Sequence, residues 1–157
     1  MTGASIPKLE NDQERIAFLN SLSIMDTSPD ENLDRVVELC RSIFNVPVAL
    51  VSLIDEERQW FKSIQGLDVC ETSREVAFCN YTILADQIFE VLNAVEDPRF
   101  VANPLVTGEP YIRYYAGAPL VFDGNRLGSL CLIDFEARPP LSPEDCLLYT
   151  SPSPRDS

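Results

Sequence analysis

The stretch SREVAFCNYTI, residues 73–83, places one cysteine among apolar and polar residues in turn. A cysteine in such a setting is a reactive thiol, a lining residue of a ligand pocket or a small apolar residue of the core. Reactivity requires a lowered thiol pKa, yet the nearest cationic residue, Arg74, lies on the opposite side of a helix drawn through this stretch. In that helix Val76, Cys79 and Ile83 share one face, so the pattern favours core packing for Cys79 and leaves pocket lining open.

The chain contains no histidine, and this absence restricts its chemistry more than any residue that is present. It excludes Ser-His-Asp and Cys-His catalysis, histidine general bases and histidine ligands of metals or haem. The sequence has five cysteines and no C-x-x-C pair: Cys40, Cys70, Cys79, Cys131 and Cys146. An odd count without a secretory signal predicts reduced thiols. We therefore expect no catalytic residue, no metal site and no identified cofactor, although Cys79 and Cys131 could form a redox pair if their elements meet at a sheet.

A second group of chemically capable side chains lies on a predicted strand over residues 112–121. Arg113, Tyr115 and Gly117 alternate along it and therefore share one face. Arginine and tyrosine recognise an anion or a ring, and glycine allows a ligand or a helix to approach closely. The alternative is a surface ion pair beside an ordinary sheet aromatic. With residues near Cys79 and on an earlier strand, the candidate ligand-binding residues are Trp60, Phe78, Cys79, Tyr81, Arg113 and Tyr115.

Length and composition limit the class of protein. A chain of 157 residues with 45% hydrophobic residues is expected to fold as one globular domain. Its net charge of −13 argues against a nucleic-acid surface, which needs clustered lysine and arginine. No apolar run approaches the roughly 20 residues that span a bilayer, and residues 1–15 lack the apolar segment of a signal peptide. We therefore expect a cytoplasmic protein that contacts neither nucleic acid nor a membrane.

Two helices are predicted in the N-terminal part of the chain. The first covers residues 10–22. Ser28, Pro29 and Glu31 are the residue types that favour the N-cap, the first position and the third position of a second helix. Apolar residues follow at helical spacing, and they predict one buried stripe: Leu33, Val36, Val37, Cys40, Ile43 and Phe44.

The rest of the chain is mainly predicted as strands. They cover residues 48–55, 59–65, 89–94, 112–121 and 126–134. The first two and the last two form hairpins, and the second hairpin has an Asp-Gly turn. Trp60 and Phe61 point to opposite faces of their strand, so only one of them is expected to serve the core. The order of helices and strands is typical of an α+β fold with an antiparallel sheet.

Two short segments between the strands carry helix signals. Thr72 and Glu75 have the spacing of a capping box, which predicts a short helix from about Ser73. The Asp-Pro step at 97–98 opens a single helical turn, and the Asn-Pro step at 103–104 is expected to end it.

The C-terminal part contains a contradiction. A helix-start signal at 142–145 is followed by two Ser-Pro steps, and a proline inside a helix costs about 3 kcal/mol. Residues 146–157 resemble a translated sequencing adapter, and we interpret them as a truncated or non-native tail, with a native disordered tail as the alternative. Residues 1–27 would then form an N-terminal helix and linker, and residues 28–145 the domain itself.

Four stretches, in this order, resemble the GAF domain of bacterial signalling proteins: LSIMDTSPDENLDRVVELCRSIFNVPVALVSLIDEERQWFKS, SREVAFCNYTI, VEDPRFVANPLVTGEPYIRYYAGAPL and GSLCLID. The resemblance covers roughly residues 15–145. It implies a six-stranded antiparallel sheet with helices on both faces and a pocket for a small molecule or chromophore. It also implies a sensory role as the N-terminal input of a longer signalling protein, in which terminal helices pass a signal to a linked output domain of the histidine kinase or diguanylate cyclase type.

The known ligands of that family find little support in this sequence. Haem-binding members commonly use histidine, and bilin-binding members pair the attachment cysteine with a histidine, whereas Asn80 and Tyr81 follow Cys79. The Asn-Lys-Phe-Asp-Glu signature of cyclic-nucleotide-binding members is absent. We therefore expect an unknown small molecule as ligand and a homodimer as a further candidate assembly. Two alternatives stay open: a ligand-free dimerisation module, and a free methionine sulfoxide reductase, whose cysteine arrangement is not found here.

Overall fold

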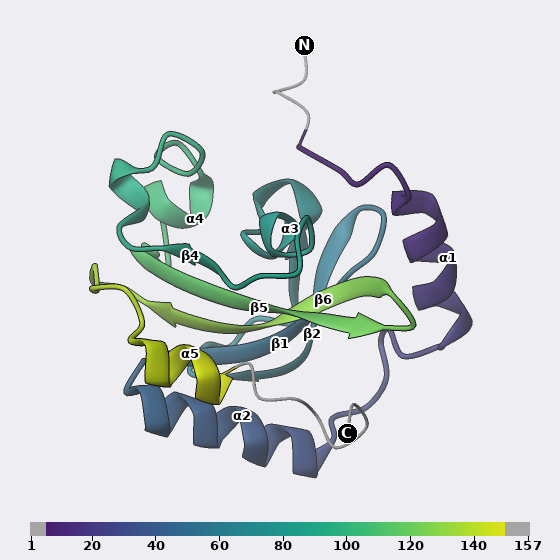
Figure 1. The fold of residues 1–157 in the computed structure, drawn as a ribbon, viewed down its shortest axis with the longest axis horizontal. Helices are drawn as coiled ribbons and strands as arrows, with labels where there is room; N and C mark the ends of the chain where they lie inside the picture. Colours follow the sequence, from purple (N-terminus) through teal and green to yellow (C-terminus); the bar gives the residue numbers. More distant parts are fainter. Residues whose placement is uncertain (1–5, 150–157) are drawn as a thin grey trace.

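The computed structural model describes residues 6–149, which fold around one six-stranded antiparallel sheet (Figure 1). The strands lie in the order β3-β2-β1-β6-β5-β4, so the hairpins β1–β2 and β5–β6 meet at the centre. Their bounds are β1 Val48–Ile54, β2 Arg58–Gln65, β3 Glu71–Ser73, β4 Phe89–Val91, β5 Tyr114–Phe122 and β6 Asn125–Asp134. Of the tail expected over residues 146–157, the part from residue 150 onward lies outside the described residues.

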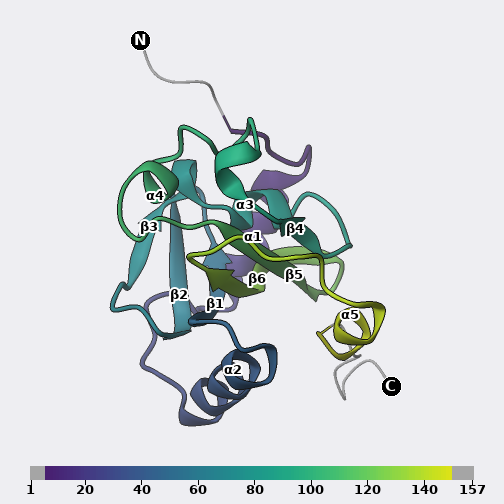
Figure 2. The same cartoon turned by 90° about the vertical axis from the view of Figure 1, so that its left-hand side faces the viewer.

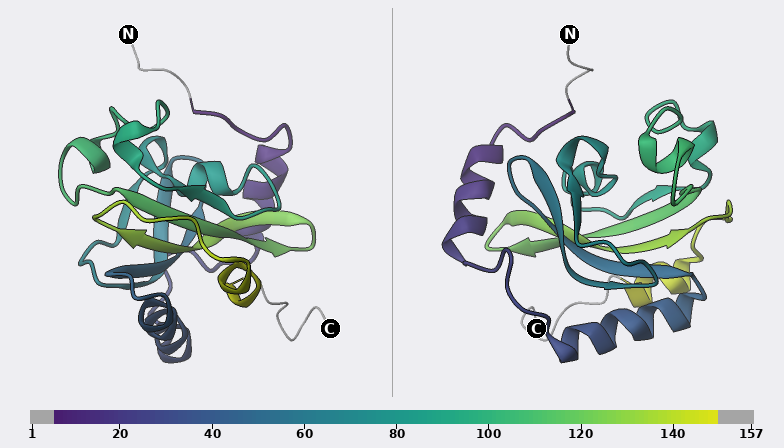
Figure 3. Two further views of the ribbon diagram at one scale, coloured as in Figure 1. Left: turned by 60° about the vertical axis from the view of Figure 1, so that its left-hand side comes forward. Right: turned by 180° about the vertical axis from the view of Figure 1, so that it is seen from behind.

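Helices cover both faces of the sheet (Figures 1 and 3). Their bounds are α1 Asp12–Ser21, α2 Glu31–Phe44, α3 Cys79–Thr82, α4 Pro104–Thr107 and α5 Pro143–Tyr149, with two 3-10 turns, η1 Arg74–Val76 and η2 Ala94–Glu96. Figure 2 shows α2 and α3 on opposite sides of the sheet. The face of α2 also carries α5, the face of α3 also carries α4, and α1 packs beside β6 at one end (Figure 1). The predicted α+β fold is confirmed.

Each face of the sheet has its own apolar core. All seven residues of β1 are buried, and they alternate: Leu50 belongs to the core under α3 and α4, whereas Ala49 and Val51 belong to the core over α2. Trp60 is buried in a third cluster beneath α1, and Phe61 packs against the core under α3. Both aromatic residues of β2 therefore serve apolar clusters, and the expectation that only one would was wrong.

The two predicted hairpins are confirmed, and both turns have a physical cause. In the β5–β6 turn Asp123 and Gly124 have positive φ angles of 49° and 78°, the backbone that an Asp-Gly step favours in a two-residue loop. In the β1–β2 turn the carboxylate of Asp55 accepts hydrogen bonds from the N–H groups of Glu57 (3.1 Å) and Arg58 (2.8 Å).

The helix α2 begins later than predicted. Its N-cap is Asp30 rather than Ser28, because the Asp30 carboxylate accepts hydrogen bonds from the N–H groups of Asn32 (2.9 Å) and Leu33 (3.2 Å). The helix ends at Phe44, and the next residue, Asn45, closes the last turn with a left-handed backbone.

The predicted apolar stripe of α2 divides between two faces. Val37 is fully buried against the sheet and Phe44 is 8% exposed, but Val36 and Ile43 are 52% and 49% exposed. Six apolar residues at spacings of three and four cover a wider arc than one contact with a sheet can bury. The prediction of a single buried stripe was therefore wrong for Val36 and Ile43, which form an exposed apolar strip with Leu39.

The helix predicted from Ser73 does not form as one element. Thr72 belongs to β3, where its hydroxyl accepts a hydrogen bond from Gln59 Nε2 (2.9 Å) and donates one to the carbonyl of Ser73 (3.0 Å). Because the hydroxyl has these partners, it does not cap a helix. The chain instead makes the turn η1 and then the four-residue helix α3, which begins at Cys79.

The Asn-Pro step at 103–104 begins a helix rather than ending one. The side-chain oxygen of Asn103 accepts a hydrogen bond from the N–H group of Leu105 (2.8 Å), and Pro104 is the first residue of α4. The turn expected before it does form, with the Asp97 carboxylate accepting a hydrogen bond from the N–H group of Arg99 (2.9 Å).

Two further elements differ in length from their predictions. The strand expected over residues 89–94 ends at Val91, because the chain then turns into η2. The helix start near residue 142 is followed by α5, whose first turn is closed by a hydrogen bond from the N–H group of Asp145 to Ser142 Oγ (3.0 Å). The two Ser-Pro steps had led us to expect no helix after this signal. That prediction was wrong, because α5 continues to Tyr149.

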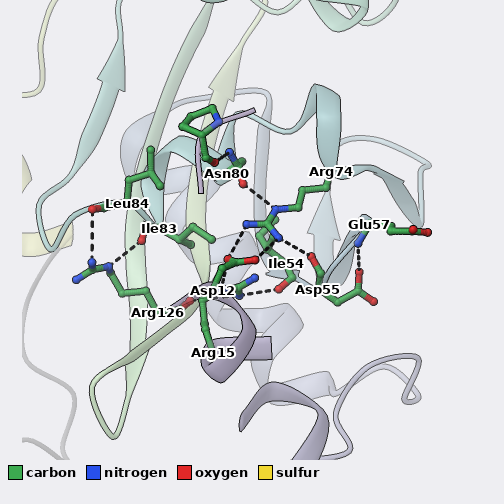
Figure 4. A network of polar contacts seen from close by, with 11 residues as sticks. Asp12, Arg15, Ile54, Asp55, Glu57, Arg74, Asn80, Ile83, Leu84 and Arg126 are labelled. Atoms are coloured by element: carbon green, nitrogen blue, oxygen red, sulfur yellow. Dashed lines mark hydrogen bonds and ion pairs between the residues drawn. The ribbon is translucent and has the colours of Figure 1, made fainter. Parts of the chain in front are cut away.

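Buried ion pairs fasten α1 to the rest of the molecule (Figure 4). The Asp12 carboxylate accepts hydrogen bonds from both terminal nitrogens of Arg74 (2.9 and 2.8 Å) and from Nε of Arg15 (3.1 Å). Arg15 Nη1 donates to the carbonyl of Ile54 (2.7 Å), and Arg74 Nε donates to Asn80 Oδ1 (2.8 Å). The three charged side chains are at most 5% exposed. The network therefore joins α1 to β1, η1 and α3.

Candidate ligand-binding site

A cavity of about 320 Å³ lies between the sheet and the short helices α3 and α4. Its wall is mostly apolar: Leu50, Phe61, Ile64, Leu67, Val69, Phe78, Leu105, Pro110, Ile112 and Ile133. The polar lining residues are Gln59, Thr72, Cys79, Glu109 and Tyr115. Ligand pockets measure about 300–1,000 Å³ and combine apolar walls with a few polar groups. The size and the lining both fit a small ligand.

Beneath the cavity lies a buried cluster of hydroxyl and thiol groups, of which Cys79 and Tyr115 line the cavity. Cys79 Sγ lies 3.2 Å from Cys131 Sγ, and the Tyr115 hydroxyl lies 3.3 and 3.2 Å from these two sulfurs. Tyr115 also shares a hydrogen bond with Thr82 Oγ1 (2.7 Å), and Cys131 shares one with Ser129 Oγ (2.8 Å). All five residues are at most 2% exposed. The cluster joins α3 to β5 and β6.

Within this cluster the pKa is lowered only for the Cys79 thiol. Burial raises the pKa of the Cys79 thiol, but hydrogen bonds from Cys131, Ser129, Ser52 and Tyr115 outweigh burial and lower the pKa to about 7. Burial raises the pKa of Cys131 and that of Tyr115, and interaction with Cys79 raises both further. Cys79 is therefore the group that carries a negative charge first.

Gly117 makes room for Tyr115. A Cβ atom at Gly117 would lie 2.3 Å from the Tyr115 hydroxyl oxygen and 2.5 Å from Thr82 Oγ1, closer than real Cβ contacts allow. The predicted close approach at this glycine does occur, and the approaching groups are a side chain of the same strand and a side chain of α3.

One hydrogen-bond acceptor in the wall has no donor in the described part of the chain. Gln59 Nε2 donates to Thr72 Oγ1, whose own hydrogen goes to the carbonyl of Ser73. The oxygen Gln59 Oε1 is buried without a partner, which costs about 1–3 kcal/mol.

Three of the six candidate residues line the cavity, namely Phe78, Cys79 and Tyr115. Phe78 stacks on Phe100, with 4.1 Å between ring centroids and 6° between ring planes, which holds it in place above the sheet. The centroid of the Tyr115 ring lies 5.2 Å from that of Phe78. The structure thus brings the candidates near α3 and the tyrosine of β5 together at one site.

The other three candidates lie outside the cavity lining. Trp60 is buried on the other side of β2, beneath α1. Tyr81 is half-buried and stacks on Phe89, with 5.8 Å between ring centroids. Arg113 precedes β5 and donates a hydrogen bond to the carbonyl of Val106 (3.0 Å), which fastens α4 to the sheet. A role for Arg113 as an anchor of α4 accounts for its position.

Most residues of the cavity wall were not among the predicted candidates, and only one of them could have been predicted from the sequence. Gln59 was detectable, since it is a polar residue that alternates with Phe61 and therefore shares its face of the predicted strand. Leu50 and Ile112 have the residue types of any core position. Glu109 reaches the cavity from a loop, and its position depends on the tertiary fold.

The chain belongs to the GAF domain family, whose model matches residues 28–151. This is the family that the four stretches of the sequence predicted. A cyclic di-GMP phosphodiesterase of Pseudomonas aeruginosa is 45% identical over 143 residues, which are 90% of this chain and 24% of that protein. The chain therefore spans about a quarter of the length of this curated relative.

Solved structures share the fold. A type II free methionine-R-sulfoxide reductase from Thermoplasma acidophilum aligns with a TM-score of 0.62 at 13% identity, over 77% of this chain and 84% of that chain. The GAF domain of a phosphoenolpyruvate-protein phosphotransferase from Coxiella burnetii aligns with a TM-score of 0.62 at 15% identity, over 88% and 87% of the two chains. At these identities the likeness shows the fold alone, and one fold hosts both kinds of protein.

None of the helices within residues 6–149 has the length and hydrophobicity that a membrane span requires.

Proposed function

We propose that this chain is a sensory GAF domain whose cavity binds a small, apolar molecule that is not an anion. Binding would regulate an output domain linked to it. The observation that carries the proposal is the cavity of about 320 Å³ between the sheet and α3 and α4. Protein interiors are otherwise close-packed, and an empty apolar space lowers stability. An occupant that fills the space offsets this cost.

The wall of the cavity supports this class of ligand. Leu50, Ile112 and Ile133 favour an apolar body. No lysine or arginine is among the described residues that line the cavity, and the lining carboxylate Glu109 is exposed, which places it at the entrance. A negative charge at the entrance disfavours anions. The unpaired oxygen of Gln59 favours a ligand that carries an N–H or O–H donor.

A route from the cavity to the N-terminal helix supports the regulatory part of the proposal. Cys79, which lines the cavity, is the first residue of α3. Its neighbour Asn80 accepts a hydrogen bond from Arg74, and Arg74 pairs with Asp12 of α1 (Figure 4). A ligand that binds one position of α3 more tightly would therefore also select a position of α1.

The output domain is proposed by analogy with the curated relative. That relative is a cyclic di-GMP phosphodiesterase, and this chain matches 24% of it. We propose that residues 28–145, with α1 as the connecting element, act in the cytoplasm as the input to a phosphodiesterase, diguanylate cyclase or histidine kinase. In this proposal the GAF domain itself performs no chemical step.

Calorimetric titration with indole tests the proposal. Indole is flat, apolar and uncharged, and it has one N–H donor; benzothiophene has the same shape without the donor. We expect the full 157-residue chain to bind indole at one site and benzothiophene at least about tenfold more weakly, the equivalent of one lost hydrogen bond. Leu105→Trp, which fills the cavity from α4, should abolish binding, whereas Val101→Trp on the exposed surface should not.

The outcomes separate the parts of the proposal. Absence of binding by indole, phenol and benzothiophene at millimolar concentration would contradict a ligand site in the cavity. Equal binding of indole and benzothiophene, with loss of both in Leu105→Trp, would support a ligand site in the cavity. It would contradict only the proposal that the ligand must carry a hydrogen-bond donor.

The homodimer expected from the sequence stays a prediction. The apolar strip of Val36, Leu39 and Ile43 on α2 is 52%, 58% and 49% exposed. A module that only dimerises would have a filled core, which the cavity does not favour. Light scattering of the full chain with and without indole distinguishes a ligand sensor from a module that only dimerises. A dimer whose mass and stability do not change with indole would favour dimerisation alone.

A thiol-dependent sulfoxide reductase is the second candidate, and the contact between Cys79 and Cys131 beside the cavity is the observation that favours it. In that reaction the S–O bond of the sulfoxide breaks, its oxygen leaves as water and the two thiols become a disulfide. The carboxylate of free methionine sulfoxide finds no cationic partner among the described lining residues, which favours the sensor. Turnover of free methionine sulfoxide with dithiothreitol, lost in Cys79→Ala, would reverse this ranking.

A further inference from the structure

The two buried sulfurs beneath the cavity are almost close enough to bond. Cys79 Sγ and Cys131 Sγ lie 3.2 Å apart, whereas a disulfide bond measures about 2.05 Å. A movement of roughly 1 Å would join them. Cys79 is at the start of the four-residue helix α3, and Cys131 is in the central strand β6. A short helix held by few turns shifts more readily than a central strand.

The two sulfurs differ in access and in ionisation. Cys79 lines the cavity, so a molecule inside it reaches this sulfur, whereas Cys131 is 0% exposed and is not part of the lining. The lowered pKa of Cys79 favours the thiolate, which is the nucleophilic form, and the raised pKa of Cys131 keeps that residue a thiol. The pair thus has one sulfur suited to react first and one suited to react second.

We propose that Cys79 and Cys131 form a redox site that a small peroxide oxidises through the cavity. The Cys79 thiolate attacks one oxygen of hydrogen peroxide, the O–O bond breaks, and the released hydroxide becomes water on protonation, which leaves a sulfenic acid on Cys79. The sulfur of Cys131 then attacks this sulfur: the S–S bond forms, the S–OH bond breaks, and the hydroxyl leaves as water with the Cys131 proton. The two sulfurs lose two electrons in all, and the peroxide becomes two molecules of water.

The disulfide would connect α3 covalently to the sheet across a separation of 52 residues. Tyr115 would lose both thiols as hydrogen-bond partners, although its bond to Thr82 would stay. Because Asn80 next to Cys79 holds Arg74, the new bond would also fix the end of the contacts that lead to α1. The inference uses the cavity only as an entrance, so it does not depend on the ligand proposed above.

Thiol counting with peptide mapping tests the inference. The full chain is treated with hydrogen peroxide, denatured, and labelled with a maleimide. We expect the labelled cysteines to fall from five to three, because two of the five form the bond. We also expect a peptide that joins the segments containing Cys79 and Cys131, released by a reductant. Retention of five labelled cysteines, or a disulfide that joins other cysteines, would overturn the inference.

Variants define the role of each sulfur. With Cys131→Ala, Cys79 should stop at the sulfenic acid and be trapped by dimedone. With Cys79→Ala, no label at Cys131 should be lost. The double variant Cys40→Ser, Cys70→Ser is the matched control, and it should still lose two labels, since those cysteines take no part. Loss of two labels in Cys79→Ala would contradict the inference. Peptide mapping uses the wild-type chain, so the inference can be tested even if a variant does not fold.

Discussion

Tyr115 shows how one side chain can shape the cavity and fasten the helix above it. Its ring lines the cavity, and its hydroxyl shares a hydrogen bond of 2.7 Å with Thr82 of α3. This position is open to Tyr115 because Gly117, two residues along the strand, has no side chain. A phenol group with all its partners buried is held in one orientation, because any other would leave its hydrogen bonds unmade.

Gly117→Ala is expected to destabilise the domain. The new methyl group would lie 2.3 Å from the Tyr115 hydroxyl oxygen and 2.5 Å from Thr82 Oγ1. The ring could make room only by moving into the cavity, which would break its hydrogen bond to Thr82. We expect a loss of about 1–3 kcal/mol in the free energy of unfolding, measured by urea denaturation. Gly108→Ala is the matched control: its Cβ would meet one backbone oxygen at 3.2 Å, a milder conflict than the contacts of 2.3 and 2.5 Å at Gly117, so it should cost clearly less. Equal effects of the two variants would contradict this account of Gly117.

At the residue scale the sequence predicted part of the site. Phe78, Cys79 and Tyr115 were expected at the pocket and do line it. Trp60 and Arg113 were also expected there, Arg113 because it alternates with Tyr115 along the predicted strand. Trp60 is on the other side of β2, and Arg113 precedes β5 and anchors α4. Chemical capability is visible in a sequence, whereas the direction in which a side chain points depends on the packing around it.

At the scale of elements, α1 is the part whose attachment depends most on charge. Asp12 is 5% exposed and lies between Arg15 and Arg74. Burial raises the pKa of Asp12, but the hydrogen bond from Arg74 and the charges of Arg15 and Arg74 outweigh it and hold the pKa below its ordinary value of 3.8. The helix is therefore held by a carboxylate that must stay ionised.

Asp12→Asn is expected to cost about 3–5 kcal/mol at neutral pH, because it leaves two buried guanidinium groups without their anion. Since the folded-state pKa lies below the unfolded value of about 3.9, the ionised carboxylate contributes fully above that pH and loses its contribution as the pH falls through the folded-state pKa. The difference between wild type and variant in urea denaturation should therefore shrink below about pH 4.

Asp86→Asn is the control for this prediction. Asp86 pairs with Arg126, but its side chain is 76% exposed, so its loss should cost at most about 1 kcal/mol. A loss in Asp12→Asn that stays as small as that in Asp86→Asn, or one that does not change with pH, would show that the buried network does not fasten α1.

Periodicity predicted the existence of most elements but not where they break. The helix α2 and both hairpins follow from spacing and turn residues. The break between η1 and α3 does not, because Thr72 has the type and spacing of a cap and is drawn into β3 by Gln59. Likewise, Val36 and Val37 are the same residue type in one stripe, and only the position of the sheet decides which is buried.

At the scale of the whole molecule, the fold forms two layers of helix on one sheet, with the cavity on the side of α3 and α4. Residues far apart in the sequence meet there, including Leu50 of β1 and Ile133 of β6. The contacts from Cys79 through Asn80 and Arg74 to Asp12 run from this cavity to α1 (Figure 4). The order of the strands was not predicted from spacing, since pairing between β1 and β6 joins segments distant in the chain.

The most direct measurement of the central claim is the location of bound indole by intermolecular nuclear Overhauser effects on the isotope-labelled full chain. The account predicts contacts between the indole ring and the methyl groups of Leu50, Ile112 and Ile133, which lie on the cavity wall. Contacts only with exposed methyl groups, such as those of Val36 and Leu39 on α2, would contradict it, as would saturating indole that contacts no methyl group of the wall.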